Sequence, residues 1–212
     1  MPEWTDAARA RLALAAAAAD LADTAAALVS TAHEDEHASA LEHLTRIEEI
    51  AGAVAEVRKL AVIHARERAM PWERIGDALG VTRQTAHARF GAVVDEWHDV
   101  LYDPDKHGWA WMPEGAYDPA ATAATLDRWL ARRHHGDGPA PTVSAGLPTY
   151  DPMTRARETL ARANWLTRRI GAGTEVSPAA KAEHHRRKDA ALTAIADDPT
   201  TPPAPQDDQP TG

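Results

Sequence analysis

Many of the apolar residues of this 212-residue chain are alanines, and this feature restricts the fold more than any other. Apolar residues make up 44% of the sequence, yet phenylalanine occurs once and seven tryptophans supply most of the aromatic bulk. Alanine has the highest helix propensity, whereas strands favour branched and aromatic side chains. The composition therefore predicts an all-α protein of closely packed helices, with a length that suits one or two small domains.

Several kinds of site and location are disfavoured by what the sequence lacks. It contains no cysteine, which excludes a disulfide scaffold, a thiolate zinc site and a cysteine nucleophile. No apolar run approaches the roughly 20 residues of a membrane span, and the N-terminus lacks the basic region and apolar core of a signal peptide. We therefore expect a cytoplasmic protein that does not enter a membrane.

Two long helices are predicted at the N-terminus, over residues 5–32 and 35–69. The second carries apolar residues at alternating three- and four-residue steps, a seam like that of a coiled coil, which only Arg58 interrupts. The seam consists of Leu41, Leu44, Ile47, Ala51, Val54, Arg58 and Ala61. The pattern is compatible with an antiparallel hairpin and with a dimerisation surface, and the sequence does not choose between them.

Proline marks the start of four further helices. Pro71 ends the second long helix and begins the next one, where its fixed φ suits the first turn. Asp118-Pro119, Asp151-Pro152 and Ser177-Pro178 each place a side chain that can cap free backbone N–H groups before a proline at the first helical position.

The stretch from residue 72 to residue 90 predicts two helices that cross closely. Ile75 and Leu79, four residues apart, give the first helix an inward face. Gly76 lies between them, where a side chain would obstruct the second helix. Gly80 ends the first helix, since that position often requires positive φ. Each local choice agrees with a tight helix pair.

The residues after Gly80 complete the corner. Val81 fills the space between the helices, and Thr82 caps the second helix. Ala86 and Phe90 face back toward the first helix. The stretch 71–91 resembles the helix-turn-helix superfamily, most closely the tri-helical variant in the C-terminal domain of sigma factors and related bacterial regulators. The resemblance is carried by Ile75, Gly76, Leu79, Gly80, Val81, Thr82, Arg83, Gln84 and Ala86.

This resemblance implies sequence-specific binding of double-stranded DNA in transcription control, and a regulator instead of an enzyme. The second helix, from residue 83 to about residue 91, would lie in the major groove. Its outward residues would read base edges: Arg83, Gln84 and His87. Contacts to the DNA backbone would come from Thr82, Arg66, Arg68 and Arg74. The family usually has an apolar residue where this chain has Arg89, next to Phe90. No cofactor or metal is implied.

The distribution of charge fits DNA binding, although the net charge of the chain is −9. Residues 58–91 contain seven basic and three acidic residues, a balance of +4, whereas the rest contains 16 basic and 29 acidic residues, a balance of −13. A basic segment within an acidic protein is compatible with binding to a polyanion.

Two other functions are weighed against this one. The helical arms are compatible with a module that docks on RNA polymerase or another protein, and a homodimer would suit DNA half-sites related by two-fold symmetry. His33 and His37 formally match the H-E-x-x-H pattern of zinc peptidases. The two middle positions of that pattern are charged and no third ligand is evident, so a zinc hydrolase ranks last.

Composition divides the chain into six parts. They are an N-terminal helical arm suited to dimerisation (1–60), a helix-turn-helix unit (61–101), a tryptophan-rich linker and helix (102–135), a Gly- and Pro-rich linker (136–149), C-terminal helices (150–196) and a tail (197–212). Trp109 and Trp111 should pin the first linker onto a neighbouring surface. The tail has nothing apolar to bury, so we expect it to be disordered. Residues 117–133 and 150–169 share short motifs, which we attribute to similar composition and not to a repeat.

Overall fold

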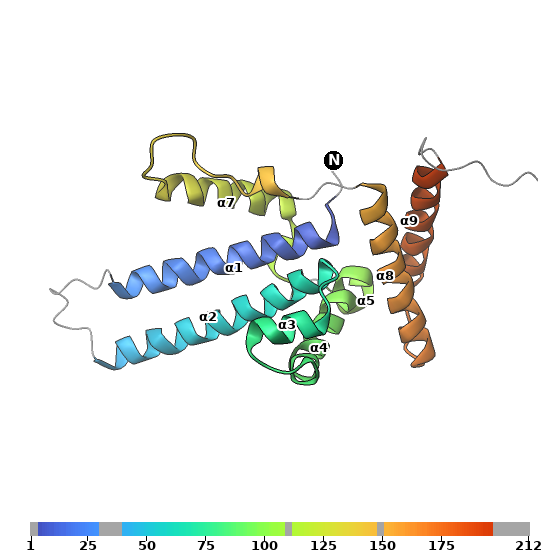
Figure 1. Ribbon diagram of the computed structural model, residues 1–212, viewed down its shortest axis with the longest axis horizontal. Coiled ribbons are helices and arrows are strands. Elements are labelled where there is room, and N and C mark those ends of the chain that lie inside the picture. The colour runs from blue at the N-terminus through green and yellow to red at the C-terminus, as the bar shows by residue number, and fades with distance from the viewer. Residues whose placement is uncertain (1–3, 30–39, 109–111, 148–150, 197–212) are drawn as a thin grey trace, which may run out of the picture. The chain divides into compact units, whose positions relative to one another are not determined.

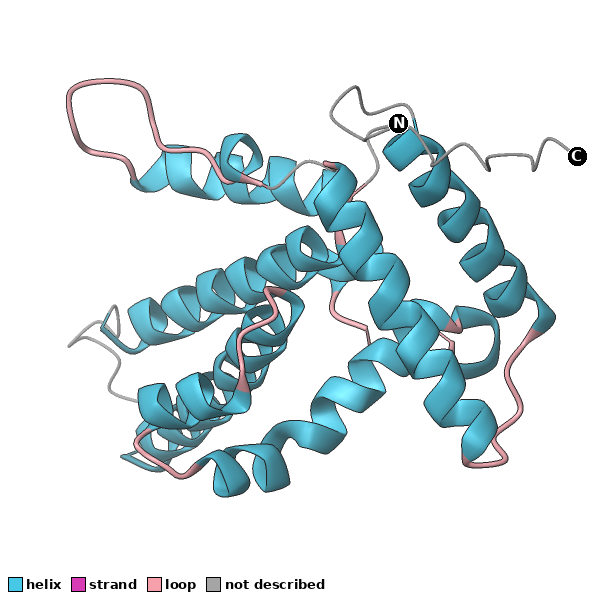
Figure 2. Ribbon diagram, turned by 45° about the vertical axis from the view of Figure 1, so that its right-hand side comes forward, coloured by secondary structure: helices cyan, strands magenta, loops and turns pink. Residues whose placement is uncertain are grey.

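The computed structural model describes residues 4–29, 40–108, 112–147 and 151–196. The chain forms two compact units, residues 1–149 (unit 1) and residues 150–212 (unit 2). The secondary structure of the described ranges consists of α-helices and one 3₁₀ turn. None of these residues is in a strand, which confirms the all-α prediction (Figures 1 and 2). Trp109, Trp111, the tail 197–212 and the pair His33 and His37 lie outside the described residues.

Unit 1 begins with two long helices. Its elements are α1 (Asp6–Val29), α2 (Ala40–Glu67), α3 (Trp72–Leu79), α4 (Arg83–Tyr102), α5 (Pro104–His107), α6 (Glu114–Tyr117), α7 (Pro119–Arg133) and the 3₁₀ turn η1 (Ser144–Gly146). Unit 2 contains α8 (Pro152–Gly171) and α9 (Pro178–Ala196). The predicted helices 5–32 and 35–69 correspond to α1 and α2, and their predicted ends between residues 30 and 39 lie outside the described ranges.

α1 and α2 lie side by side as an antiparallel hairpin (Figure 1). Between residues 41 and 60, the residues of α2 with the least exposed side chains recur at steps of three and four: His43, Arg46, Ile50, Ala53, Val57 and Leu60. His64 continues this line beside Val62 and Ile63, which are also buried. Arg46 reaches across to α1, where its Nη1 donates to the carbonyl oxygen of Ala27 at 2.9 Å. This line of residues is therefore the face that packs against α1.

The seam predicted from the sequence is a different face of α2, and it is exposed. Leu41, Leu44 and Ile47 are 71%, 63% and 48% exposed, and Val54 is 39% exposed. The sequence left open whether this seam packs within a hairpin or against a second chain, and the contact with α1 is made by the other line of residues. Both lines of residues repeat at nearly 3.5-residue spacing, so periodicity alone does not show which one is buried.

α1 lies at the centre of unit 1, against α2, α6 and α7. The backbones of α1 and α6 approach closely, since a Cβ placed on Gly115 would lie 2.7 Å from the backbone nitrogen of Ala13. Arg9 crosses the same junction, and its Nη1 donates to the carbonyl oxygen of Ala116 at 2.6 Å. Small side chains on α1 permit this packing on three sides.

By length and composition alone, α1 could cross a membrane. This corrects the expectation that no apolar run approaches such a span. Alanines account for the discrepancy, because they raise the average hydropathy of the helix while each buries little surface. In unit 1, 17% of the apolar stretch of α1 is buried, and the helix is joined to α4 by a hydrogen bond of 3.2 Å that the buried Asp6 carboxylate accepts from the Tyr102 hydroxyl.

A chain of polar contacts joins α2, α4 and α1. Glu67 at the end of α2 is hydrogen-bonded to Nε2 of His98 on α4 at 2.8 Å. The His98 ring stacks on the ring of Tyr102, with centroids 5.1 Å apart. Tyr102 in turn donates to Asp6. These contacts fix α4 to both helices of the hairpin.

The three helix starts predicted after residue 100 are confirmed. α7, α8 and α9 begin at Pro119, Pro152 and Pro178. Each preceding side chain accepts a hydrogen bond from a backbone N–H three residues onward, at 3.0 Å for Asp118, 2.7 Å for Asp151 and 3.1 Å for Ser177. The capping side chain and the proline act within a single helical turn. The sequence alone therefore predicts where these helices start.

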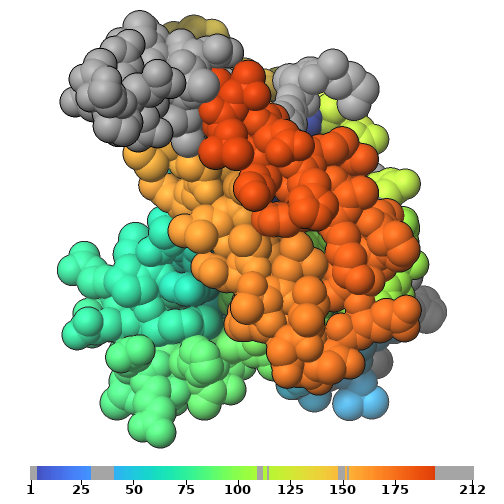
Figure 3. Space-filling model, turned by 90° about the vertical axis from the view of Figure 1, so that its right-hand side faces the viewer, coloured from blue at the N-terminus to red at the C-terminus, as the bar shows by residue number. Residues whose placement is uncertain are grey.

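The Gly- and Pro-rich segment 136–149 is fastened to α7 by one side chain. The Asp127 carboxylate accepts hydrogen bonds from the backbone N–H of Val143 at 2.6 Å and from the hydroxyl of Ser144 at 2.6 Å. Val143 and Leu147 also pack against the apolar cluster between α1 and α7. In unit 2, α8 and α9 lie against each other (Figure 3), and Arg187 of α9 is hydrogen-bonded to Glu183 at 2.7 Å.

His64, on the inner face of α2, should make the stability of the protein depend on pH. Burial lowers the pKa of His64, the nearby Arg11 and Arg68 lower it further, and Glu67 opposes them. The unfolded chain, with a histidine pKa of about 6.5, binds the proton first as the pH falls. The free energy of unfolding should therefore decrease as the pH falls below about 6.5, until the folded-state pKa is passed.

Urea unfolding at a series of pH values would measure this effect. The wild-type protein should lose more stability between about pH 7.5 and about pH 5 than His64→Gln does. His135→Gln, which changes an exposed histidine, is the matched control and should behave like the wild type. Equal pH dependence in the wild type and His64→Gln would contradict the assignment.

Candidate nucleic-acid interface

A left-handed glycine joins α3 to α4. Gly80 has φ +68° and ψ +29°, and its N–H donates to the carbonyl oxygen of Asp77 at 3.2 Å. The N–H of Val81 donates to the carbonyl oxygen of Gly76 at 2.9 Å. Such bonds satisfy carbonyl groups at the end of a helix and turn the chain sharply. The sequence predicted both the position of the corner and the positive φ of Gly80.

Gly76 lies where the two arms of the corner come closest. A Cβ at this position would lie 2.7 Å from the carbonyl oxygen of Val81 and 3.1 Å from the backbone nitrogen of Arg83. Both obstructing atoms belong to the backbone, so they cannot move aside as the end of a side chain can. The absence of a side chain at Gly76 therefore sets the separation between α3 and the start of α4.

The inner face of the corner is built by apolar residues of both helices. Ile75 on α3 is buried, and so are Ala86 and Phe90 on α4. Leu79 and Val81 are half-buried beside them. Arg89, which stands where the resembling family usually has an apolar residue, is exposed, with its guanidinium 5.3 Å from the centroid of the Phe90 ring. Phe90 thus supplies the core contact that Arg89 does not.

Thr82 caps α4. Its Oγ1 accepts a hydrogen bond from the backbone N–H of Thr85 at 3.1 Å and shares another with the Thr85 hydroxyl at 2.9 Å. Because the cap uses the side chain of Thr82, an anion at this end would be bound mainly by backbone N–H groups of the first turn. Such groups have no partner within a helix and attract negative charge.

The three residues predicted to read bases lie together at this end of α4. Arg83, Gln84 and His87 are all exposed. Residues three and four apart share one side of a helix, so these side chains project from one face. The buried Ala86 and Phe90 lie three residues beyond Arg83 and His87, so they occupy the adjoining side of α4, which packs in the corner.

His87 is held in place by an aromatic residue that the sequence analysis did not single out. Its ring lies edge-on to the ring of Trp72 on α3, with centroids 5.2 Å apart. Trp72 also contacts Arg66 of α2, whose guanidinium carbon lies 5.0 Å from the indole centroid. Arg66, Trp72 and His87 therefore form a stack, which we call the Trp72 stack, that joins α2, α3 and α4.

The predicted DNA-backbone residues fall into two groups. Arg66 is half-buried, its Nη1 donates to the carbonyl oxygen of Met70 at 2.5 Å, and burial lowers the pKa of its guanidinium while Glu67 raises it. These contacts commit Arg66 to the interior of the corner. Arg68, just beyond α2, and Arg74 on α3 are exposed and can reach a ligand.

Acidic residues limit the extent of a basic surface here. Glu73 and Asp77 are exposed on α3, and Asp95 and Glu96 are exposed on the second half of α4. A polyanion would be repelled by these carboxylates. Contact with DNA would therefore involve the first two turns of α4 and the arginines beside them, which agrees with the predicted span of residues 83–91.

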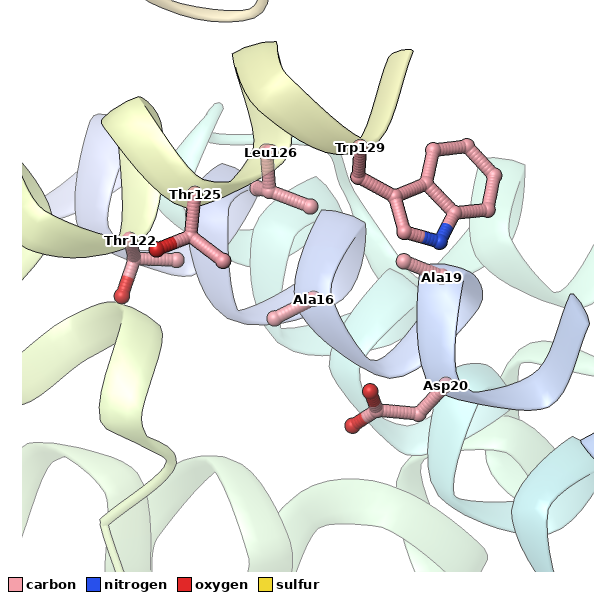
Figure 4. A pocket seen from close by; sticks show the side chains of 7 residues that line it. All are labelled: Ala16, Ala19, Asp20, Thr122, Thr125, Leu126 and Trp129. Atoms are coloured by element: carbon pink, nitrogen blue, oxygen red, sulfur yellow. The ribbon is translucent and has the colours of Figure 1, made fainter. Parts of the chain in front are cut away.

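A pocket lies between α1 and α7 in unit 1. It has a volume of about 140 Å³, and Figure 4 shows Leu126 and Trp129 of α7 facing Ala16 and Ala19 of α1 across it. Pockets for small-molecule ligands usually enclose about 300–1,000 Å³. The described residues also contain no cluster of three or more side chains suited to hold a metal ion. The α3–α4 corner is the stronger candidate site.

Comparison with known proteins identifies no relative of this chain. No protein-family model matches the chain, and no curated protein or solved structure is significantly similar to it.

Gly76→Ala should destabilise unit 1 by about 1–3 kcal/mol, because the new methyl group would overlap backbone atoms of Val81 and Arg83. Helix propensity alone would make Gly76→Ala stabilising, because a helix with alanine at an interior position is more stable than one with glycine by roughly 0.5–1 kcal/mol. Gly52→Ala on α2, where a Cβ meets nothing within 4 Å, is the matched control and should be stabilising. Urea unfolding followed by circular dichroism measures both variants, and a Gly76→Ala protein as stable as the wild type would contradict the close approach.

Proposed function

We propose that the α3–α4 corner binds double-stranded DNA in a sequence-specific manner, and that the protein is a cytoplasmic regulator of transcription and not an enzyme. The observation that carries the proposal is the exposure of Arg83, Gln84 and His87 together at the capped end of α4, while the buried Ala86 and Phe90 hold the adjoining side of the helix in the corner. A helix presented in this way is the element that helix-turn-helix proteins place in the major groove.

Each exposed residue has a chemical partner in that groove. The guanidinium of Arg83 can donate two hydrogen bonds to O6 and N7 of guanine, and the amide of Gln84 can pair with N6 and N7 of adenine. His87 presents a ring nitrogen to a base edge in an orientation that the Trp72 stack supports. Residues 83–91 are accordingly the proposed recognition segment.

Contacts to phosphate would orient this segment without reading sequence. Thr82 and the N–H groups of the first turn of α4 lie at a helix start, which favours an anion. Arg68 and Arg74 supply positive charge from the neighbouring elements. Arg66 contributes indirectly by supporting Trp72 and, through it, His87.

Arg83→Ala and Arg74→Ala should weaken DNA binding in different ways. We expect Arg83→Ala to lose about 1–3 kcal/mol of binding free energy for the selected sequence, roughly 5- to 150-fold in Kd, with little change for other duplexes. Arg74→Ala should weaken all duplexes alike and reduce the slope of log Kd against log salt by about one. Duplexes selected from genomic fragments, titrated by fluorescence anisotropy at several salt concentrations, would measure both effects.

Arg132→Ala, an exposed arginine on α7, is the matched control and should bind like the wild type. The proposal fails if the wild-type protein binds no duplex even at low salt. It fails equally if Arg83→Ala keeps full preference for the selected sequence.

A further inference from the structure

The exposed seam of α2 is a surface that DNA binding does not use. Leu44, Ile47 and Val54 lie on it at helical spacing, and all three are exposed. Single exposed apolar residues are normal in soluble proteins, whereas a contiguous apolar surface of several hundred Å² marks an interaction site. The question is therefore whether the seam is continuous with other apolar surface.

α1 carries a matching stripe of exposed apolar residues. Ala18, Ala22 and Val29 are exposed and lie four and seven residues apart, which places them on one side of α1. Each residue advances about 100° around a helix. In both helices the stripe is rotated by about 90° around the helix axis from the side that faces the other helix, in the direction in which the chain winds. Because both helices are right-handed and run antiparallel, these rotations place the two stripes on the same face of the hairpin.

The opposite face of the hairpin has a different character. Asp20 on α1 and Glu49 and Glu56 on α2 are exposed there. The hairpin as a whole is therefore amphipathic, with an apolar face formed by Ala18, Ala22, Val29, Leu44, Ile47 and Val54 (the hairpin face) and an acidic face behind it. Amphipathic helices in globular proteins turn their apolar side toward a packing partner.

We propose that the hairpin face is covered by a second copy of this chain, so that two α1–α2 hairpins form a four-helix bundle. Two helices about 9 Å apart, exposed over roughly 30 Å, present about 600 Å² per copy. Pairing two such faces would bury about 1,200 Å², the lower bound for a stable interface. The tail 197–212 is not a suitable occupant, because its sequence consists of Asp, Pro, Thr, Gln and Gly with a single alanine.

Two charges on α2, Glu48 beside the hairpin face and Arg58 at the C-terminal end of its seam, are complementary to those of a second copy in antiparallel orientation. Glu48 lies toward the N-terminal end of α2 and Arg58 toward its C-terminal end, and both are exposed. An antiparallel pair of α2 helices centred near residue 53 would bring each Glu48 beside Arg58 of the partner subunit. Such pairs at the edge of a helical interface determine partner orientation more than affinity. Antiparallel pairing also gives closed two-fold symmetry, which stops assembly at the dimer.

This inference does not rest on the proposed function. Dimerisation is measured on the protein without DNA, and the variants change α2, not α4. A failure to dimerise would leave the DNA-binding proposal intact, and a failure to bind DNA would leave the dimer intact.

Sedimentation velocity on the full 22.9-kDa chain tests the dimer directly. The wild type should sediment as a dimer at concentrations from about 1 to 100 µM, whereas Leu44→Asp and Ile47→Asp should raise the dimer Kd by about 100-fold or more, because each places an unpaired carboxylate in the interface. Both side chains are exposed within the monomer, so an unchanged far-ultraviolet circular dichroism spectrum should show that the variants fold. A monomeric wild type, or dimers of undiminished stability in both variants, would overturn the proposal.

A charge exchange tests the orientation. Glu48→Arg and Arg58→Glu should each weaken the dimer, since each brings like charges together twice across the two-fold axis. The double variant, Glu48→Arg with Arg58→Glu, should restore it. Glu49→Arg makes the same charge change on the acidic face and should leave the dimer unchanged. Absence of rescue in the double variant would overturn the antiparallel arrangement.

Discussion

The contact between the α3 backbone and residues 81–83 is the constraint on which the α3–α4 corner depends. At Gly76 the two backbone segments are so close that a methyl group would not fit between them. At this separation Ile75 of α3 and Ala86 and Phe90 of α4 are all buried, and their burial sets the rotation of α4 about its own axis. With that rotation, Arg83, Gln84 and His87 are exposed in the first turns of α4. One missing side chain thus determines the face that the protein presents.

Much of the fold could be predicted from the sequence because it is encoded within single turns. The starts of α7, α8 and α9 each depend on a capping side chain and a proline that are adjacent in the chain. The corner at Gly80 is equally local, since glycine is the residue that adopts positive φ without strain. The all-α architecture followed from the abundance of alanine. The direction of the exposed residues on α4 was also predicted, because the buried positions beside them have clear helical spacing.

The parts that could not be predicted depend on contacts between distant segments. α2 has two stripes with the same periodicity, and only the position of α1 decides that Ile50 and Val57 are covered while Leu44 and Ile47 are not. The length and alanine content of α1 suit a core helix and a membrane span alike. Its contacts with α6 and α7, including the close approach at Gly115, join it to the rest of unit 1. The contacts of Trp72 with Arg66 of α2 and His87 of α4 likewise join separate helices, so the sequence did not indicate them.

The Trp72 stack has a consequence for the energetics of recognition. A long side chain that becomes fixed on binding loses rotamer freedom, at a cost of about 0.5–1.5 kcal/mol. Arg83 and Gln84, exposed at the end of their helix, would lose that freedom when they meet a partner. The imidazole of His87 already rests against an indole that is itself braced by a guanidinium from another helix. Part of its rotamer freedom is therefore already lost when the chain folds, and less remains to be lost when the ring meets a partner.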